Sequence, residues 1–522
     1  MIHFMIVIAL ESHITYIDIT NLPQEILEAN PDISNAVAND GQNDADAIQA
    51  AIDYVAAQRA EGFTGEATIY IPNGVFNLAN TIDIGISGIT LEGEGIGVSV
   101  LQNDDTFQVG TEGLPDSGTD FNSVNRDAYL FDLDDNADNV TFTNMTLSGP
   151  EIHGAILGFR ADGLDISGVE FNNFGWSSLR LFNLNNATIS NNTFIDAGGQ
   201  AKGTHGATGG SIYATYLEGS EIYNNDISRS GEREGNVFGI KGRQFRNTRI
   251  HHNTINTNFA IELPFENDEF VEIDHNYLDG VVSIPKFGGG VVPDKGFTFH
   301  IHHNYFTQSY SLELPRNGTE IDHNVFVFDP AKDKGNLMAK FGQEPASGPT
   351  QFHNNLILNP GRGIFWSEGI YNNLSFYNNE VIVNETATPR TEGLFGFNSE
   401  TDFSTIEIKD NLIRVNGLSR PLLRNEASYN AIIENNTLIN ISDVGKLSNP
   451  DTREPRGLID PLSFQVGVGG EFSVEGADIK VNNDVTVDPN QPPVANDDTV
   501  TVEQGDSITI DSWVMTPIRK EI

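Results

Sequence analysis

The chain has 522 residues, enough for two or three average domains or for one large elongated domain. It carries 73 acidic against 29 basic residues, a net charge of −44, which argues against a nucleic-acid binder that relies on a broad basic face. It has no cysteine, which excludes disulfides, thiolate metal sites and cysteine nucleophiles. No apolar run reaches the roughly 18 residues of a membrane-spanning helix, so we expect no membrane span.

The first predicted element is a helix. We interpret residues 1–35 as a leader or extension, because the opening ten residues are apolar. From Asp44 to Ala57, Ala, Ile and Val recur at spacings of three and four residues, and acidic residues occupy the first turn, a pattern that predicts a helix. Directly after it, short β-branched runs alternate with Gly and Asn turns, which predicts short strands.

From there to about residue 440 the chain repeats one unit: a short strand, an Asn-centred turn and another short strand. The turns end at asparagines spaced 33, 28, 23, 28, 20, 31, 24, 32 and 25 residues apart, namely Asn192, Asn225, Asn253, Asn276, Asn304, Asn324, Asn355, Asn379, Asn411 and Asn436. A period in the twenties predicts a β-solenoid, whereas the blades of a β-propeller need about 40 residues. We therefore predict an all-β fold over residues 36–440, a parallel β-helix of roughly a dozen coils capped by the helix, with asparagines of neighbouring coils hydrogen-bonded in a ladder.

Beyond residue 440 the repeat fades. We expect a C-terminal β extension over residues 441–488 and then, over 489–522, a Pro-rich linker and the start of a further module. The stretch "VDPNQPPVANDDTVTVEQGDSITID" resembles the first strands of the cadherin-like or immunoglobulin-like modules of large bacterial secreted proteins. That resemblance stops at Asp511, so we expect a truncated module without catalytic groups.

The N-terminal pattern carries a second resemblance. "NDGQNDADAIQAAIDYVAAQ", followed by "ATIYIPNGVFNLANTIDI", is similar to the N-terminal cap and first coil of the pectate-lyase-like superfamily. The resemblance covers residues 38 to about 440 and implies a right-handed β-helix and a secreted, extracellular bacterial protein that acts on a polysaccharide. That superfamily contains lyases, hydrolases, epimerases and phage tailspikes, so the fold does not choose among them.

Polar residues recur at one strand position when the coils are aligned. "FGIKGR", "FAIELPF", "VVSIPKF" and "YSLELPR" align, and earlier coils add "SLRLF" and "SIYAT"; the shared position holds Arg180, Tyr213, Lys241, Glu262, Ser283 and Glu313. A solenoid interior has no room for charge, so we expect these side chains to point outward along one strip of one sheet, about 4.8 Å apart from coil to coil. Inert solenoid faces carry Thr, Ser and Asn, so this mixture favours a functional surface over an ordinary solvated sheet face.

A second column follows the prolines that end three of these strands and holds Phe265, Lys286 and Arg316. β-Elimination on a uronate polymer needs a neutralised carboxylate, a base for the C5 proton and an acid for the leaving oxygen. The stretch from residue 281 to 326 resembles polysaccharide lyase family 6, the alginate and dermatan lyases, which carry a Lys base and an Arg acid on successive coils. The resemblance implies that Lys286 is the base and Arg316 the acid. The alternative is that both are surface cations of an acidic protein.

A hydrolase interpretation uses two carboxylates instead. Glu262 and Glu313 share the first column two coils apart, about 9.6 Å by strand spacing. That separation lies at the upper edge of the range for inverting glycosidases, roughly 6.5–9.5 Å. In this alternative Lys241, Lys286 and Arg316 would hold the sulfate or carboxylate groups of a carrageenan-like or fucan-like glycan.

Residues around the two columns are predicted to bind the substrate. Residues 233–340 hold 11 of the 29 basic residues beside 14 acidic ones, an enrichment that suits an anionic polymer. We assign substrate binding to Lys241, Arg180, Tyr213, Arg243, Lys340 and Trp366. Trp366, together with Phe365, would form a platform for sugar stacking.

Neither mechanism requires a cofactor, and Ca²⁺ is the ion that the sequence suggests. Glu266 and Asp268 lie in the acidic stretch 266–274, which offers hard oxygen ligands, and Asp279 stands where family 6 members hold Ca²⁺. Histidines immediately precede four ladder asparagines and share one corner of the coil, so we interpret them as structural: His252, His275, His303 and His323. We extend the same interpretation to His251 and His302.

The sequence thus predicts a secreted bacterial enzyme, a monomer that cleaves an acidic polysaccharide such as alginate by β-elimination. Hydrolysis by Glu262 and Glu313 is the first alternative. The second is a non-catalytic adhesin whose β-helix binds carbohydrate ahead of cadherin-like modules.

Overall fold

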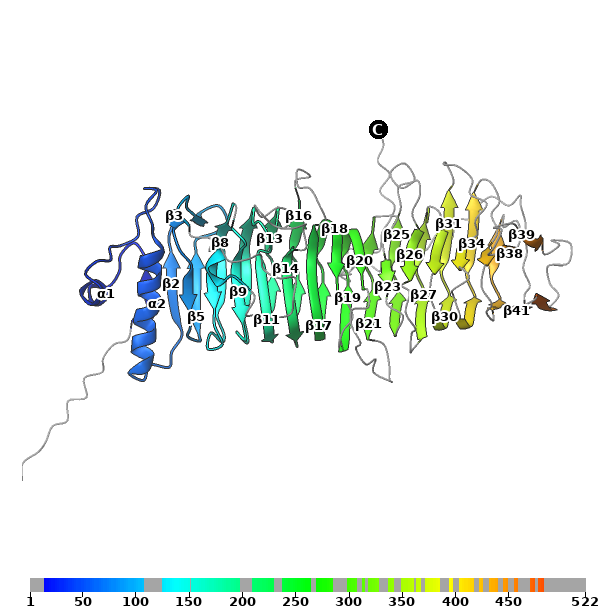
Figure 1. Cartoon of the computed structure of the whole chain (residues 1–522), viewed down its shortest axis with the longest axis horizontal. Coiled ribbons are helices and arrows are strands. Elements are labelled where there is room, and N and C mark those ends of the chain that lie inside the picture. The colour runs from blue at the N-terminus through cyan, green and yellow to red at the C-terminus, as the bar shows by residue number, and fades with distance from the viewer. Residues whose placement is uncertain are drawn as a thin grey trace, which may run out of the picture.

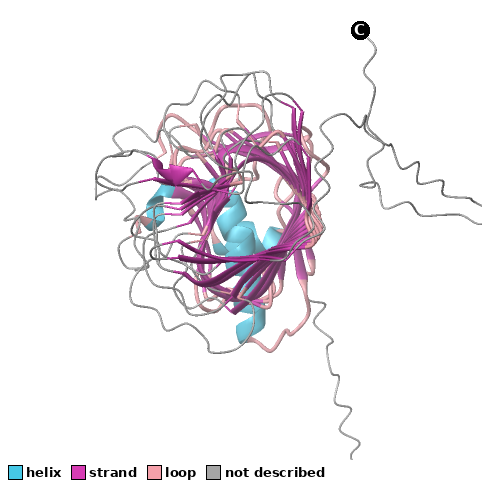
Figure 2. Ribbon diagram, turned by 90° about the vertical axis from the view of Figure 1, so that its right-hand side faces the viewer, coloured by secondary structure: helices cyan, strands magenta, loops and turns pink. Residues whose placement is uncertain are grey.

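The protein is a rod built from stacked β coils, seen here in a computed structural model (Figure 1). The structure describes residues 14–107, 124–150, 152–197, 209–229, 237–263, 269–284, 298–307, 312–314, 318–327, 337–341, 349–360, 363–367, 371–384, 394–397, 403–416, 422–425, 431–439, 445–448, 455–458, 470–474 and 477–482. Three strands make one coil, and each strand pairs in parallel with the equivalent strand of the next coil. Viewed along the rod, the strands form sheets that wrap around a common interior (Figure 2).

Three sheets, which we call sheets 1 to 3, run the length of the rod, and some strands continue around a corner from one sheet into the next. Sheet 1 contains β1 (Tyr16–Asp18), β2 (Ala67–Ile71), β5 (Ile89–Gly93), the first halves of β8 (Thr141–Ser148) and β10 (Asp165–Asn172), β12 (Thr188–Ser190), β15 (Glu221–Tyr223), the end of β17 (Phe238–His251), β19 (Glu269–Asp274), β21 (Phe299–His302), β24 (Thr319–Asp322), β27 (Pro349–His353), β30 (Tyr371–Tyr377), β33 (Phe403–Lys409), β36 (Ala431–Glu434) and β41 (Ala477–Asn482).

Sheet 2 contains β3 (Gly74–Leu78), β6 (Ser99–Asn103), the second halves of β8 and β10, β13 (Thr193–Ile195), β16 (Asp226–Ser228), the starts of β18 (Thr254–Glu262) and β20 (Tyr277–Ser283), β22 (Tyr305–Phe306), β25 (Val325–Val327), β28 (Leu356–Leu358), β31 (Glu380–Asn384), β34 (Leu412–Asn416) and β37 (Thr437–Ile439). Sheet 3 contains β4 (Ile82–Ile84), β7 (Tyr129–Leu133), β9 (Gly154–Phe159), β11 (Leu179–Asn185), β14 (Gly210–Glu218), the start of β17, the ends of β18 and β20, β23 (Leu312–Leu314), β26 (Leu337–Phe341), β29 (Gly363–Ser367), β32 (Phe395–Phe397), β35 (Leu423–Asn425) and β38 (Gly445–Ser448). Near the far end β38 pairs antiparallel with β39 (Pro455–Leu458), and β40 (Gly470–Val474) pairs antiparallel with β41.

A helix closes the N-terminal end of the rod, as the sequence predicts. Helix α2 (Ala45–Ala60) buries Ile48, Ile52 and Val55 against the first coil and keeps acidic residues in its first turn. A short helix that the sequence analysis did not predict, α1 (Gln24–Ala29), precedes it and contributes Ile26 to the same core. The helix covers the hydrophobic interior that the first coil would otherwise expose to water.

The interior is apolar and is stacked coil on coil. Inward-facing side chains alternate along each strand with outward-facing ones, as in β2, where Ala67, Ile69 and Ile71 are buried. Equivalent rings of neighbouring coils lie face to face; the ring centroids of Phe306 and Phe326 are 4.6 Å apart. This spacing is close to the strand separation of a β sheet, so each added coil repeats the contacts of the one before.

The predicted asparagine ladder is confirmed at the corner between sheets 1 and 2. In every step from Asn192 to Asn436 the side-chain Nδ2 of one asparagine donates to the Oδ1 of the next, at 2.8–3.1 Å. That Oδ1 also accepts the backbone N–H of the preceding asparagine, as between Asn276 and Asn304 at 3.0 Å. The residue before each ladder asparagine has a φ of 52–57°, in the left-handed region, where Asn, Asp and His are the favoured non-glycine residues. The corner histidines therefore have the structural role that the sequence analysis gave them.

The predicted fold, a right-handed parallel β-helix, is confirmed. Of the predicted leader or extension at residues 1–35, residues 1–13 lie outside the described residues, while residues 14–35 contain β1 and α1. The predicted linker and module at 489–522 also lie outside the described residues.

Candidate functional site on the outer face of sheet 3

The column predicted from the aligned coils is present as one continuous register on sheet 3. Arg180 pairs with Tyr213, and the register continues through Lys241, Glu262, Ser283, Glu313, Lys340 and Trp366. Leu179 and Leu181, on either side of Arg180, face the core, so this column faces outward. We call the residues from Arg180 to Glu313 in this register the sheet 3 strip.

The first part of the strip is buried, and here the expectation of an exposed groove is wrong. Arg180 and Tyr213 are both fully covered although they point away from the interior. The Arg180 guanidinium carbon lies 3.6 Å from the ring centroid of Phe182 and 3.9 Å from that of Tyr213. Nη1 donates to the Tyr213 carbonyl oxygen at 3.3 Å and to Thr215 Oγ1 at 3.1 Å.

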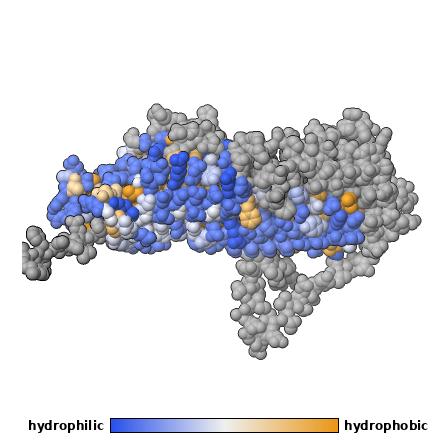
Figure 3. Space-filling model, turned by 90° about the horizontal axis from the view of Figure 1, so that it is seen from below, coloured by the Kyte–Doolittle hydropathy of each residue, from blue (hydrophilic) through white to orange (hydrophobic). Residues whose placement is uncertain are grey.

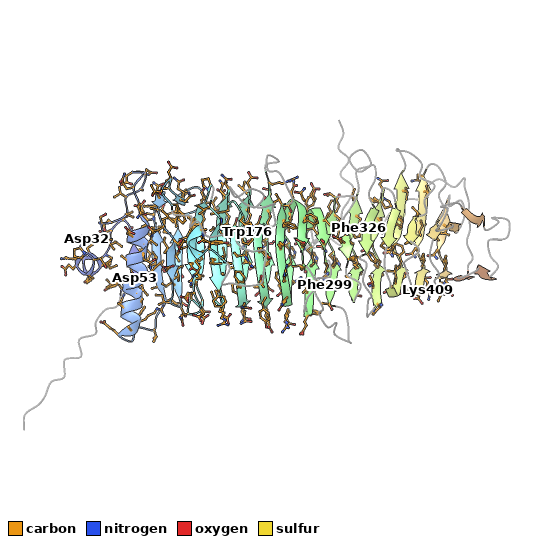
Figure 4. The ribbon with its side chains drawn as sticks, viewed as in Figure 1. Asp32, Asp53, Trp176, Phe299, Phe326 and Lys409 are labelled. Carbon is orange, nitrogen blue, oxygen red and sulfur yellow. The ribbon has the colours of Figure 1, made fainter. Side chains whose placement is uncertain are left out.

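Side chains also pack against one another on the outside of sheet 3, and one of them, Phe182, lies against Arg180. A small apolar cluster separate from the main core forms there, made of Val124, Ala128, Tyr129, Leu157 and Phe182. Trp176, labelled in Figure 4, packs beside Tyr213, with ring centroids 5.6 Å apart. Because burial removes water from the guanidinium, the pKa of Arg180 falls to about 10. Arg180 therefore holds these side chains together and does not meet a polymer directly.

The strip comes closer to the surface at Lys241 and Glu262, although Lys241 is still buried. Lys241 Nζ lies 3.0 Å from Glu262 Oε2, and the two side chains are 10% and 17% exposed. The same ammonium lies 4.1 Å from the ring centroid of Phe238. Burial lowers the pKa of Lys241 although Glu262 opposes the shift, so its ammonium loses a proton more readily than that of an ordinary surface lysine.

The next two residues of the strip form a second polar pair. Ser283 Oγ donates to Glu313 Oε2 at 2.8 Å, and the Ile284 N–H donates to the Glu313 carbonyl oxygen at 2.6 Å. Glu262, Ser283 and Glu313 are consecutive in the register, so the two carboxylate-bearing residues stand two coils apart, about 9.6 Å by strand spacing. The separation used in the hydrolase interpretation thus rests on an observed register.

The remaining predicted substrate-binding residues fall into three groups. Arg243 is half-buried and faces outward two positions along β17 from Lys241. Lys340 and Trp366 lie in the column by backbone pairing, while their side chains are outside the described set. Phe365, predicted to join Trp366 in a sugar platform, is instead fully buried in the main core.

Several predicted catalytic and metal-binding residues cannot be placed. Lys286, Arg316, Glu266 and Asp268 lie outside the described residues. Asp279 is described; its Oδ1 accepts a hydrogen bond from Thr307 Oγ1 at 2.9 Å. Asp279 belongs to neither of the described groups of His and carboxylate side chains that lie close enough together for a shared metal ion.

Sequence reasoning missed a group of buried polar residues at the N-terminal end of the strip. Asp132 stands in the same register two coils before Arg180, and Tyr129 and His153 lie nearby with ring centroids 6.3 Å apart. Tyr129 Oη, Asp132 Oδ1 and His153 Nδ1 are buried and make no hydrogen bond within the described part of the chain. Burial raises the pKa of Asp132 to about 6, against the opposing effect of Arg126, and lowers that of His153 to about 4. Extending the aligned column two coils toward the N-terminus would have found Asp132.

A family model and one solved structure support the fold. A family model described as "Right handed beta helix region" matches residues 132–326. A mutant tailspike protein of E. coli bacteriophage HK620, solved in complex with a hexasaccharide, is 13% identical with a TM-score of 0.56, over 83% of this chain and 80% of that chain. PfbA, a surface adhesin of Streptococcus pneumoniae, is 14% identical with a TM-score of 0.43, over 90% and 99%. DFA-IIIase from Arthrobacter chlorophenolicus A6, in complex with GF2, is 12% identical with a TM-score of 0.43, over 81% and 94%. No curated protein matches the sequence.

None of the described helices is long and apolar enough to span a bilayer.

Proposed function

We propose that this protein cleaves an acidic polysaccharide by β-elimination at uronic acid units, with the polymer lying along the sheet 3 strip. The observation that carries the proposal is the register in which Lys241, Glu262, Ser283 and Glu313 follow one another on one outward face. These four residues place a cation, two carboxylates and a hydroxyl on successive coils, about 4.8 Å apart. A sugar unit of a polymer spans a comparable distance, so each coil would meet a different group of the chain.

The strand ends support Lys286 as the base and Arg316 as the acid. Ser283 and Glu313 are in register and hydrogen-bonded, and the buried residues Ile284 and Leu314 follow them on adjacent coils. In the sequence, a proline and then the cation follow each of these two residues. A lysine and an arginine at equivalent sequence positions of successive coils would suit a uronate, whose carboxylate must be neutralised while its C5 proton is removed.

Lys241 binds the substrate in this proposal and takes no part in the chemical step. Its ammonium is already balanced by Glu262 at 3.0 Å, so an arriving carboxylate or sulfate would share an existing ion pair. We assign Lys241 to substrate binding, with Arg180 and Tyr213 as the buried support that fixes its position. This support replaces the direct substrate contact that the sequence predicted for both residues.

Hydrolysis is the second candidate, and the register of Glu262 and Glu313 favours it. Two carboxylates about 9.6 Å apart across one strip leave room for a water molecule on one side of a glycosidic bond. The tailspike of similar fold was solved with a hexasaccharide. Because fold alone does not assign function, we base the proposal of a glycan ligand on the residues of the strip. In either case we propose a secreted, monomeric bacterial enzyme.

The deciding experiment follows absorbance near 235 nm and reducing ends together, on alginate, pectate, dermatan and carrageenans. Both signals would rise for a lyase, because elimination leaves an unsaturated uronate. Lys286→Ala should then reduce the rate on the order of 10³-fold. Lys409→Ala, a cation on sheet 1 paired with Glu407, is the matched control and should keep the parent rate.

Other outcomes contradict the β-elimination proposal. Reducing ends without absorbance would identify a hydrolase, and Glu262→Gln and Glu313→Gln would then be the inactivating variants. No cleavage of any polymer, with retained binding to one of them, would identify a carbohydrate-binding adhesin.

A further inference from the structure

Imidazole and carboxylate groups meet on the outer face of sheet 1, on a different sheet from the strip. Two adjacent outward columns run across β17, β19, β21, β24 and β27. One holds Arg249, Glu272, His300, Glu320 and Gln351, and the other holds His251, Asp274, His302, Asp322 and His353. In Figure 4, Phe299 of β21 lies in the lower half of the rod, away from Trp176, which packs beside the sheet 3 strip. The lower face of the molecule, where described, is predominantly hydrophilic (Figure 3).

Three of these residues converge. His302 Nε2 lies 2.8 Å from Glu272 Oε1 on the preceding coil. His300 and His302, two positions apart on β21, have ring centroids 4.0 Å apart. One ligand atom from each of Glu272, His300 and His302 falls within 4.8 Å of the other two. For bonds of about 2.1 Å to a metal ion, neighbouring ligand atoms stand about 3.4 Å apart, so small side-chain rotations would bring all three onto one ion.

The backbone fixes these side chains on the outer face. Phe299 and Ile301 alternate with the two histidines and are buried in the main core. Two residues beyond His302, Asn304 belongs to the ladder and donates to Asn324 Oδ1 at 3.0 Å. The histidine pair therefore stands on a rigid strand, and its rotation is limited to the side-chain torsions, which is the condition for a preorganised ligand set.

Neighbouring groups orient the three side chains. His300 Nε2 lies 2.6 Å from Asp322 Oδ1, so Nδ1 is the ring nitrogen that His300 has left for a metal. His302 Nδ1 lies 2.8 Å from His303 Nδ1, which leaves Nε2 directed at Glu272. A carboxylate that accepts from the distal ring nitrogen, as Asp322 does for His300, is a usual outer partner of a metal-ligating histidine, because it fixes the tautomer and the ring plane.

The corner histidines provide a contrast within the same molecule. His252, His275, His303 and His323 stack with ring centroids 4.9–5.0 Å apart and nearly parallel planes, so their geometry repeats the coil. Contacts between the two columns recur diagonally from coil to coil: Arg249 with Asp274, His300 with Asp322 and Glu320 with His353 repeat the contact of Glu272 with His302. What sets Glu272 apart is that two imidazoles of one strand, His300 and His302, lie within reach of a single carboxylate on the preceding coil.

We propose that Glu272, His300 and His302 bind a divalent transition-metal ion, with Zn²⁺ as the test ion. Two imidazole nitrogens and one carboxylate oxygen form a donor set that suits Zn²⁺, Fe²⁺ and their neighbours and not the all-oxygen preference of Ca²⁺. The side chains of His300, Glu272 and His302 are 31%, 27% and 11% exposed, so the ion would reach them from solvent. The ion would join β19 to β21 as a staple between coils. This site is separate from the sheet 3 strip and does not depend on the proposed activity.

The experiment titrates Zn²⁺ into the full chain after treatment with a chelator, by calorimetry and by thermal unfolding. We expect one strong site and a rise in Tm, because an ion bound only by the folded state stabilises it. Either His302→Gln or Glu272→Gln should weaken Zn²⁺ binding by about 100-fold and remove the rise in Tm. Gln at residue 302 keeps a donor for Glu272, so the metal-free variant should unfold within a few degrees of the parent.

His252→Gln is the matched control, since it removes a histidine of the corner stack and leaves the three ligands intact. Equal loss in His252→Gln and His302→Gln would overturn the proposal in favour of general binding to surface histidines. Parent-like binding by both ligand variants, or binding of Ca²⁺ in preference to Zn²⁺, would overturn it as well. Loss in Asp322→Asn without loss in Glu272→Gln would move the ion to the neighbouring group of His300, Glu320 and Asp322. Absorbance of bound Co²⁺ in the visible range gives a readout of coordination that needs no enzyme activity.

Discussion

The asparagine corner and the sheet 3 strip follow the same coil repeat and use it in opposite ways. At the corner one residue type makes the same two hydrogen bonds in every coil, from Asn192 to Asn436. Along the strip the side chain changes at each step, and so do its partners: a guanidinium among rings, an ammonium beside a carboxylate, a hydroxyl beside another carboxylate. In a solenoid, sameness from coil to coil reports what the fold requires. Positions where the residue changes from coil to coil are positions whose side chains the fold does not dictate, and these are the candidates for function.

The largest expected effect is a loss of folding stability when one asparagine of the corner ladder is replaced. Asn276→Ala removes the side-chain bonds to Asn304 Oδ1 and the Ile250 carbonyl oxygen and leaves the Asn253 N–H without its acceptor. Each buried polar group left unpaired costs about 1–3 kcal/mol, so we expect a loss of about 4 kcal/mol in the free energy of unfolding by denaturant. Asn224→Gly, at an exposed residue with φ of 53°, is the control and should change it by less than about 1 kcal/mol. Equal losses of unfolding free energy in the two variants would show that the ladder asparagines do not stabilise the fold more than an exposed corner residue does.

A somewhat smaller effect tests whether Arg180 is part of the packing. Arg180→Ala leaves a cavity between Phe182 and Tyr213 and removes the donor to Thr215, so we expect a loss of about 3 kcal/mol in unfolding free energy. Activity per folded molecule should fall less than in Lys286→Ala. Unchanged stability together with lost activity would instead support the direct substrate binding that the sequence analysis predicted for Arg180.

His153 makes the buried end of the strip sensitive to pH. Its pKa is about 4 in the folded protein and about 6.5 when unfolded, so the unfolded chain binds a proton more readily. The contribution of neutral His153 is therefore complete above about pH 6.5 and is lost as the pH falls toward 4, by at most about 3 kcal/mol. Unfolding by denaturant between pH 7 and 4 should show a shallower slope in His153→Gln than in the parent. Parallel slopes would contradict a buried neutral imidazole.

The smallest expected effect concerns affinity for the polymer. Lys241→Met removes one cation from the strip, and we expect about tenfold weaker binding of an anionic oligosaccharide, or about 1.4 kcal/mol. Binding of a neutral oligosaccharide should not change. Lys409→Met, on sheet 1, is the control for charge alone, and an equal loss in this variant would show that general charge and not the strip attracts the polymer.

The sequence by itself determined the fold, the helix that caps it, the corner asparagines and the register of the strip. It could do so because a solenoid pairs each strand with its own repeat, so aligning the repeats in the sequence already aligns the strands in space. The register from Arg180 to Glu313 follows from that alignment even though the coils differ in length.

Only the tertiary structure decided which outward-facing side chains are exposed to solvent and which contact one another. The rings of Trp176, Phe182 and Tyr213 surround the Arg180 guanidinium, and periodicity within a strand carries no information about such a covering layer. The convergence of Glu272 with His300 and His302 likewise depends on side-chain rotations across two coils, which the corner pattern of histidines conceals in the sequence. Strand repeats fix where a backbone lies, while burial and contact on the outer face depend on what packs against it.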